Sequence, residues 1–302
     1  MIITNITGIG DPQIILFEGV YYCYATTPAS ENKNFYVWKS DDLVNWSDKI
    51  LCFEASKAWG DRDFWAPEVV YHNGKFIMHY SARRAEDNSL RLGVAVSDSP
   101  EGPFTDVYGK PMFDLGYATI DGSVLICEEG NFFYYSRDCS ENWVDGVRLS
   151  QTYCMKLDDT LTKVISEPML MTTPTEEYER KSLHVRSKPT LWNEGPTVIK
   201  LGNKYVMNYS TNYFGSNDYA ICVATADHPL GPWKKSVNNP VLSCNPDLFG
   251  AGHNAFFKTK NGELYTSFHI QTYPDNPSGD RRTVIGKVTF SEKNGDIFEE
   301  IE

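Results

Sequence analysis

The stretch NEGPTVIKLGNKYVMNYS, residues 193–210, decides the fold because its order of features returns elsewhere in the chain. It combines an acidic residue beside Gly-Pro, an apolar strand, a turn built on Gly202 and Asn203, and a second strand that ends in Tyr-Ser. Residues 65–81, WAPEVVYHNGKFIMHYS, follow the same order almost unit for unit. Self-similar units separated by a long interval indicate a repeat architecture.

Three other copies of this unit open at Asp11, Ile120 and Ala251, so that five copies start roughly 50 to 75 residues apart along nearly the whole chain. That spacing suits four short strands and their loops, the content of one propeller blade. Each turn alone would also fit a hairpin of a β-sandwich, but the repeated order of features favours a propeller. The sequence therefore predicts an all-β fold, a five-bladed β-propeller that forms a single domain over residues 1–302.

Composition supports a folded, strand-rich protein and narrows its partners. Hydrophobic residues make up 41% of the chain and aromatic residues 14%, which excludes disorder and favours strands over helices. The 40 acidic and 28 basic residues give a net charge of −12, which repels nucleic acid and anionic membranes. We therefore expect a small-molecule or oligosaccharide substrate, no nucleic-acid or membrane partner, and a monomer or weak homo-oligomer.

The seven cysteines are scattered without a Cys-x-x-Cys pair, which predicts neither a zinc site nor a disulfide framework. Several, such as Cys23, lie in apolar runs, which favours buried thiols and a reducing compartment. The first residues lack the features of a secretory signal, and no later stretch approaches the roughly 20 apolar residues of a membrane span. We expect a cytoplasmic protein, or a secreted or periplasmic one if a signal segment has been removed.

The openings of the copies carry the candidate chemistry. The first strand of each propeller blade lines the central channel, so the openings should converge on one axial cavity. They contribute Asp11, Asp121 and Glu194, each beside Gly or Pro where a strand interior would prefer apolar residues. Crowded carboxylates repel, so that one stays protonated near neutral pH while another stays charged. Hydrolysis of an acetal needs that pair, an acid for the leaving oxygen and a base for water.

Four openings also resemble the successive blade motifs of glycoside hydrolase family 43, in order and in spacing along the whole chain. They are Gly10-Asp11-Pro12, Trp65-Ala66-Pro67-Glu68, Ile120-Asp121-Gly122-Ser123 and Asn193-Glu194-Gly195-Pro196. The resemblance implies a five-bladed propeller that cleaves xylose- or arabinose-containing plant polysaccharides, or their oligosaccharides, with inversion. It implies Asp11 as general base, Glu194 as general acid, and Asp121 as the group that holds Glu194 and raises its pKa. The acid and base of an inverting pair stand about 6.5 to 9.5 Å apart.

The same resemblance suggests substrate-binding residues. Trp65 and Phe64 are expected at the pocket rim, where an aromatic face stacks on a sugar ring, with packing between blades as the competing interpretation. Glu68 takes a supporting or substrate-binding role, or is an ordinary hydrogen-bonded Glu. Arg282 resembles a family arginine that reaches a sugar hydroxyl, although the adjacent Arg281 leaves the choice between the two open.

His253 is similar to a family histidine near the propeller axis that in several members binds calcium, usually through water. Imidazole is an unusual direct ligand for calcium, which prefers oxygen. A structural calcium ion near His253 and a histidine hydrogen-bonded to a buried water or carboxylate are therefore both open. No cofactor is required by the implied chemistry.

Several questions stay open in the sequence. The resemblance covers β-xylosidases, α-L-arabinofuranosidases, endo-xylanases and arabinanases. The polar insertion between Leu157 and Asn193 is interpreted as a pocket wall that favours exo action. One rival is a catalytically silent carbohydrate-binding propeller. Others are a retaining five-bladed hydrolase, whose carboxyl groups would stand about 5 to 5.5 Å apart, and a glycoside phosphorylase, which would need basic residues to hold phosphate.

Overall fold

The computed structural model describes residues 1–28, 34–277, 280–293 and 296–302. Within them, every regular element longer than four residues is a β-strand. The strands are rich in β-branched and aromatic residues, which suit a pleated, half-buried surface. The short exceptions are three 3-10 turns, η1 (Ala55–Lys57), η2 (Cys139–Glu141) and η3 (Glu177–Arg180). No helix of the described residues is long and apolar enough to cross a membrane.

The strands form five antiparallel units that follow one another along the chain. The first unit consists of β2 (Gly10–Phe17), β3 (Val20–Thr26), β4 (Asn34–Ser40) and β5 (Ile50–Glu54). The second consists of β6 (Arg62–His72), β7 (Lys75–Arg83), β8 (Leu90–Ser97) and β9 (Thr105–Asp106). The third is β10 (Thr119–Cys127), β11 (Gly130–Arg137), β13 (Val147–Leu157) and β14 (Met169–Thr172). The fourth is β15 (Thr190–Leu201), β16 (Lys204–Thr211), β17 (Ala220–Ala226) and β18 (Lys234–Lys235). A short parallel contact between β13 and β15 joins the third and fourth units, and β12 (Trp143–Val144) pairs with the start of β13.

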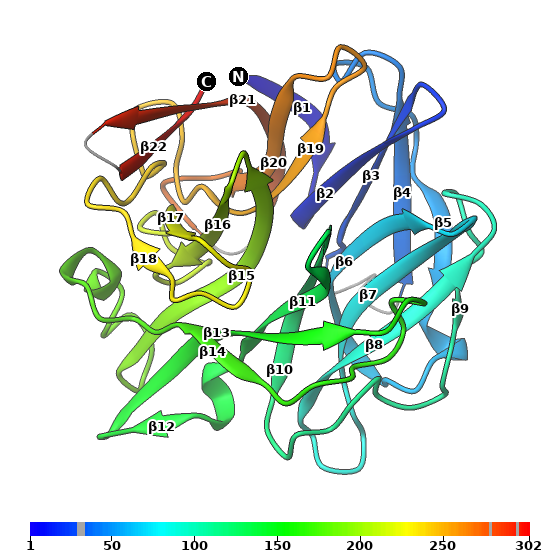
Figure 1. Ribbon diagram of the computed structural model, residues 1–302, viewed down its shortest axis with the longest axis horizontal. Coiled ribbons are helices and arrows are strands. Elements are labelled where there is room, and N and C mark those ends of the chain that lie inside the picture. Colours follow the sequence, from blue (N-terminus) through cyan, green and yellow to red (C-terminus); the bar gives the residue numbers. More distant parts are fainter. Residues whose placement is uncertain (29–33, 278–279, 294–295) are drawn as a thin grey trace.

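The fifth unit closes the ring with both ends of the chain. Its strands β19 (Gly252–Lys258), β20 (Leu264–Gln271) and β21 (Arg281–Lys293) are completed by β1 (Ile2–Thr7) and β22 (Asp296–Ile301), which both pair with β21. Ile2 lies opposite Ile285 and Ile301 opposite Val288, so the two termini meet on one strand (Figure 1). The first residues of the chain therefore supply part of the outer strand of the last blade.

The first strands of the units lie against one another around the axis. Contacts connect β2 with β6, β6 with β10, β10 with β15, β15 with β19, and β19 back to β2. The later strands of each unit lie toward the outside of this ring (Figure 1). Aromatic side chains pack between neighbouring sheets, with Phe35, Phe53 and Tyr80 fully buried between the first and second. This is the predicted five-bladed propeller.

Each inner strand carries a bulge at the same place. The pairing register shifts there, and the bulged residue has a left-handed backbone. The five residues and their φ angles are Asp11 (53°), Ala66 (46°), Asp121 (58°), Gly195 (56°) and His253 (51°). A β-bulge bends the strand and re-aims a side chain, and bulges are common beside active sites.

The bulges bind the blades to one another. In every case the backbone N–H of the bulged residue donates to a side chain on the second strand of the preceding blade. The donor and acceptor pairs are Ala66 to Thr26 (2.7 Å), Asp121 to Ser81 (3.0 Å), Gly195 to Ser136 (3.1 Å), His253 to Ser210 (2.7 Å) and Asp11 to His269 Nδ1 (3.2 Å). The ring therefore satisfies five backbone groups that the bulges remove from the strand ladders.

Candidate active site

The three acids proposed from the sequence meet in one pocket. Asp11, Asp121 and Glu194 lie on the inner strands β2, β10 and β15, and all three line a cavity of about 390 Å³. Their exposed fractions are only 10%, 8% and 8%, so each carboxyl group reaches the cavity from a largely buried position. Asp11 and Asp121 are themselves bulge residues, and Glu194 immediately precedes one.

Asp11 is held as a carboxylate. Arg281 Nη1 donates to its Oδ1 at 2.9 Å, and His253 Nδ1 lies 3.4 Å from the same oxygen. The Thr26 hydroxyl donates to Oδ2 at 2.6 Å. Burial alone would raise the pKa of Asp11, but the positive charge of Arg281, with His253, His269 and the Thr26 hydroxyl, holds it well below its ordinary value. Asp11 is therefore ionised at neutral pH.

Glu194 is held in the opposite state. Burial and the nearby negative charge of Asp121 raise the pKa of Glu194 well above its ordinary value, and the Tyr219 hydroxyl donates to its Oε1 at 2.9 Å. Asp121 accepts from the Ser136 hydroxyl and from the Gly195 backbone N–H, both at 3.2 Å, and so sits against the residue next to Glu194. Burial raises the pKa of Asp121 to about 6, although His253 opposes the rise. The pocket thus contains a charged carboxylate and a protonated carboxyl group.

Tyr219 and His269 link these two groups and were not identified from the sequence. Their rings are stacked, with their centres 5.5 Å apart and an interplanar angle of 10°. His269 Nδ1 accepts the backbone N–H of Asp11, and burial, followed by the charge of Arg281, lowers the pKa of His269 well below its ordinary value. A neutral His269 therefore fixes Asp11 from one side of the stack, while Tyr219 fixes Glu194 from the other.

Trp65 and His253 line the same pocket, as expected. Glu68 does not. It faces a much smaller cavity of about 10 Å³, which it shares with Asp11 and Asp121, and a separate cavity of about 410 Å³ that contains none of the three acids. Its Oε1 accepts the Val124 N–H at 3.3 Å, and burial raises its pKa to about 8. Glu68 is therefore a buried, hydrogen-bonded residue outside the pocket that the three acids share.

Two of the expected substrate-binding residues, Phe64 and Arg282, do not line the pocket. Phe64 is 1% exposed and packs with Phe35, Phe53 and Tyr80 between blades, so it does not reach the pocket. Neighbouring residues of a strand point to opposite faces, and Trp65 takes the pocket side. For the same reason Arg281, and not Arg282, lines the pocket.

The residues around His253 do not fit a directly bound calcium ion. Among the residues that the structure describes, no group of three or more His, Cys, Asp and Glu side chains is placed to hold a metal. His253 instead lies beside the Asp11 carboxylate, which Arg281 already neutralises. Calcium takes six to eight oxygen ligands, which a nitrogen and one paired carboxylate do not supply.

Comparison with known proteins is decisive for the family. The sequence matches glycosyl hydrolases family 43 over residues 6–295. The chain belongs to this family. It is 40% identical to a solved thermostable family-43 glycoside hydrolase, with a TM-score of 0.90 over 99% of this chain and 94% of that one. It is 26% identical to a β-D-galactofuranosidase of Aspergillus niger over 93% of this chain and 79% of the relative. It is 25% identical to a xylosidase/arabinosidase of Bacteroides ovatus over 86% of this chain and 85% of the relative.

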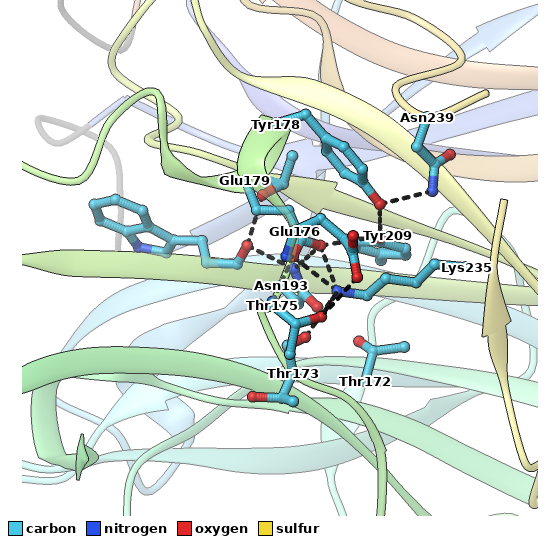
Figure 2. A network of polar contacts seen from close by, with 12 residues as sticks. Thr172, Thr173, Thr175, Glu176, Tyr178, Glu179, Asn193, Tyr209, Lys235 and Asn239 are labelled. Atoms are coloured by element: carbon cyan, nitrogen blue, oxygen red, sulfur yellow. Dashed lines mark hydrogen bonds and ion pairs between the residues drawn. The ribbon is translucent and has the colours of Figure 1, made fainter. Parts of the chain in front are cut away.

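This family 43 glycoside hydrolase secures the strand of Glu194 with a buried ion pair (Figure 2). Glu179, in η3, is fully buried, and Lys235 Nζ donates to its two carboxylate oxygens at 2.6 and 2.8 Å. Asn193, the residue before Glu194, donates to the same carboxylate at 2.9 Å, and the Tyr209 hydroxyl does so at 3.0 Å. The insertion between Leu157 and Asn193 is therefore partly the outer strand β14 and partly a segment fastened to blade four.

We expect Lys235→Met to lower the free energy of unfolding of the hydrolase by about 3–5 kcal/mol, because it leaves Glu179 buried without a counter-charge. Urea denaturation measures the change. Lys234→Met is the matched control, since Lys234 is 68% exposed and pairs with Asp296 at the surface, where a pair contributes about 0–1 kcal/mol. The double change Glu179→Gln with Lys235→Met should recover part of the loss. Equal effects of the two single lysine changes would show that the ion pair is not what fastens η3.

Proposed function

We propose that this hydrolase acts with inversion on xylose- or arabinose-containing plant oligosaccharides, with Asp11 as general base, Glu194 as general acid and Asp121 as the residue that adjusts the pKa of Glu194. One observation carries the proposal. A carboxylate stabilised by Arg281 and a carboxyl group kept protonated by burial and by Asp121 line the same pocket.

In the proposed reaction Asp11 accepts a proton from a water molecule as the water oxygen attacks the anomeric carbon. At the same time Glu194 donates its proton to the glycosidic oxygen, and the bond between that oxygen and the anomeric carbon breaks. The products are a free sugar of inverted configuration and the released alcohol or shorter oligosaccharide, which keeps the proton from Glu194. Asp11 is left protonated and Glu194 ionised, and both exchange protons with solvent before the next cycle. Arg281 and the Thr26 hydroxyl orient the base, while the Tyr219 hydroxyl orients the acid.

The substrate side of the proposal rests on the pocket wall and the relatives. Trp65 offers an aromatic ring to a sugar face, and the names of two relatives specify galactofuranoside and xyloside or arabinoside substrates. Arg186 and Trp192, from the insertion and the strand that follows it, also line the cavity. A wall at that place supports exo action, in which one end of a chain enters the pocket. A calcium ion near His253 stays a prediction, and no step depends on it.

The test combines a substrate panel with product stereochemistry. We expect turnover of 4-nitrophenyl β-D-xylopyranoside or α-L-arabinofuranoside, with β-D-galactofuranoside as the third candidate. Proton NMR of the first-formed sugar should show the inverted anomer, without any requirement for phosphate. A retained anomer or phosphate-dependent cleavage would contradict the proposed mechanism. Binding of xylo- or arabino-oligosaccharides without any turnover would instead indicate a carbohydrate-binding propeller.

A further inference from the structure

The pocket of this acidic protein contains four arginines, Arg83, Arg148, Arg186 and Arg281. Two of them have carboxylate partners, because Arg281 binds Asp11 and Arg83 binds Asp63. In the described part of the chain no ion pair joins Arg148 or Arg186 to a carboxylate. Of the three acids, Asp11 pairs with one pocket arginine, Arg281. The guanidinium groups of Arg148 and Arg186 line the cavity without an assigned role.

Aromatic rings hold both of these guanidinium groups by their faces. Arg148 lies over the ring of Trp143, 4.8 Å from its centre, across the β12–β13 hairpin. Arg186 lies over the ring of Tyr213 at 5.4 Å. Stacking fixes the plane of a guanidinium and leaves its N–H edge for a ligand. The Nε of Arg148 is buried and has no hydrogen-bond partner among the described residues, so no described carboxylate or carbonyl group engages that edge of its guanidinium.

Both arginines lie on neighbouring segments of the pocket wall. The backbone N–H of Arg148 donates to the carbonyl of Pro189 at 2.9 Å, three residues after Arg186. Burial raises the pKa of Cys139 well above its ordinary value, and the charges of Arg186 and Arg148 both oppose that rise, so both act on the same thiol. The Asp138 carboxylate lines the same pocket, and its Oδ1 accepts the Ser140 N–H at 2.9 Å as the cap of η2.

We propose that Arg148 and Arg186 form an oxyanion subsite that binds the carboxylate of a uronic acid unit in the substrate. The inference deepens the proposed function, on which it rests, by assigning acidic oligosaccharides as the substrate class. Arginine presents a planar fork that matches a carboxylate in two parallel hydrogen bonds, and charge-assisted bonds of this kind are the strong ones. A neutral xylose or arabinose offers no such group. Inorganic phosphate has the same oxyanion chemistry, and the experiment separates it from a uronate.

The experiment compares xylotriose with xylotriose that carries one glucuronic acid substituent. Isothermal titration calorimetry on the Glu194→Gln variant measures binding without turnover, and kcat/KM is measured on the unaltered protein. We expect the acidic sugar to bind about 10-fold or more tightly than the neutral one, with the preference weakening as salt is added. Arg148→Gln combined with Arg186→Gln should reduce the ratio of the two affinities to near 1. Arg62→Gln, at a surface arginine paired with Asp61, is the control and should leave that ratio unchanged.

Equal affinities in the parent, or an unchanged ratio in the double variant, would overturn the inference. A folded double variant that loses affinity equally for both sugars would also overturn it, because the arginines would then contact neutral hydroxyls. Phosphate that is consumed in cleavage, and that loses its effect in the double variant, would assign the subsite to phosphate. Absence of hydrolysis with an intact acidic preference in the calorimeter would refute the proposed reaction while supporting the subsite.

Discussion

Replacement of Glu194 with Gln is expected to lower kcat/KM on an unactivated disaccharide by about 100- to 10,000-fold, the usual contribution of one positioned acid or base. The amide keeps the size and the hydrogen bond from Tyr219 but has no proton to give the leaving oxygen. The value of kcat/KM on a 4-nitrophenyl glycoside should fall much less, because nitrophenolate leaves without full protonation. Steady-state kinetics on the two substrates measures the difference.

The pH profile is the control for this variant. In the parent, activity should fall as pH rises through the raised pKa of Glu194, because only its protonated form donates. The amide of the Glu194→Gln variant does not titrate, so the alkaline fall should disappear in its residual activity. An alkaline limb that survives, or equal losses on both substrates, would assign the acid role to another group.

Asp11→Asn is expected to lower kcat/KM by a similar factor of about 100 to 10,000, but equally on both classes of substrate. Activation of water does not depend on the leaving group, whereas the Glu194 step does. The change also leaves Arg281 in a buried site without its carboxylate partner, so stability must be measured alongside activity. Thermal unfolding of the variant gives that control.

Azide distinguishes a lost base from a damaged pocket in the Asp11→Asn variant. Azide attacks without giving up a proton, so it should restore part of the turnover and produce a glycosyl azide of inverted configuration. A glycosyl azide with retained configuration would show that a covalent glycosyl-enzyme intermediate still forms, and would identify Asp11 as the acid/base residue of a retaining enzyme. A folded variant that keeps most of its activity on both substrates would remove Asp11 from the mechanism.

The residues that hold the acids were partly visible in the sequence. Ser81 and Ser210 end equivalent strands of the second and fourth repeats, and Ser136 ends the matching strand of the third. Their recurrence is part of the repeat, yet their role depends on the neighbouring blade. Ser136, for example, donates to Asp121 of its own blade and accepts from Gly195, which the next blade brings to it. Tyr219, Arg148 and Arg186 fall outside the repeated unit, so no sequence pattern singled them out.

The amino-acid sequence by itself determined the number of blades and the place of the three acids. Both follow from a local order of turn, strand and acidic opening, which each repeat specifies with its own residues. Only the tertiary structure decided between Trp65 and Phe64 and between Arg281 and Arg282. Adjacent residues of a strand face opposite sides of the sheet, and a bulge interrupts this alternation. Which of two adjacent side chains faces the pocket therefore depends on how the strands pair. The protonation states were likewise decided by burial and by charges that come together only when the ring closes.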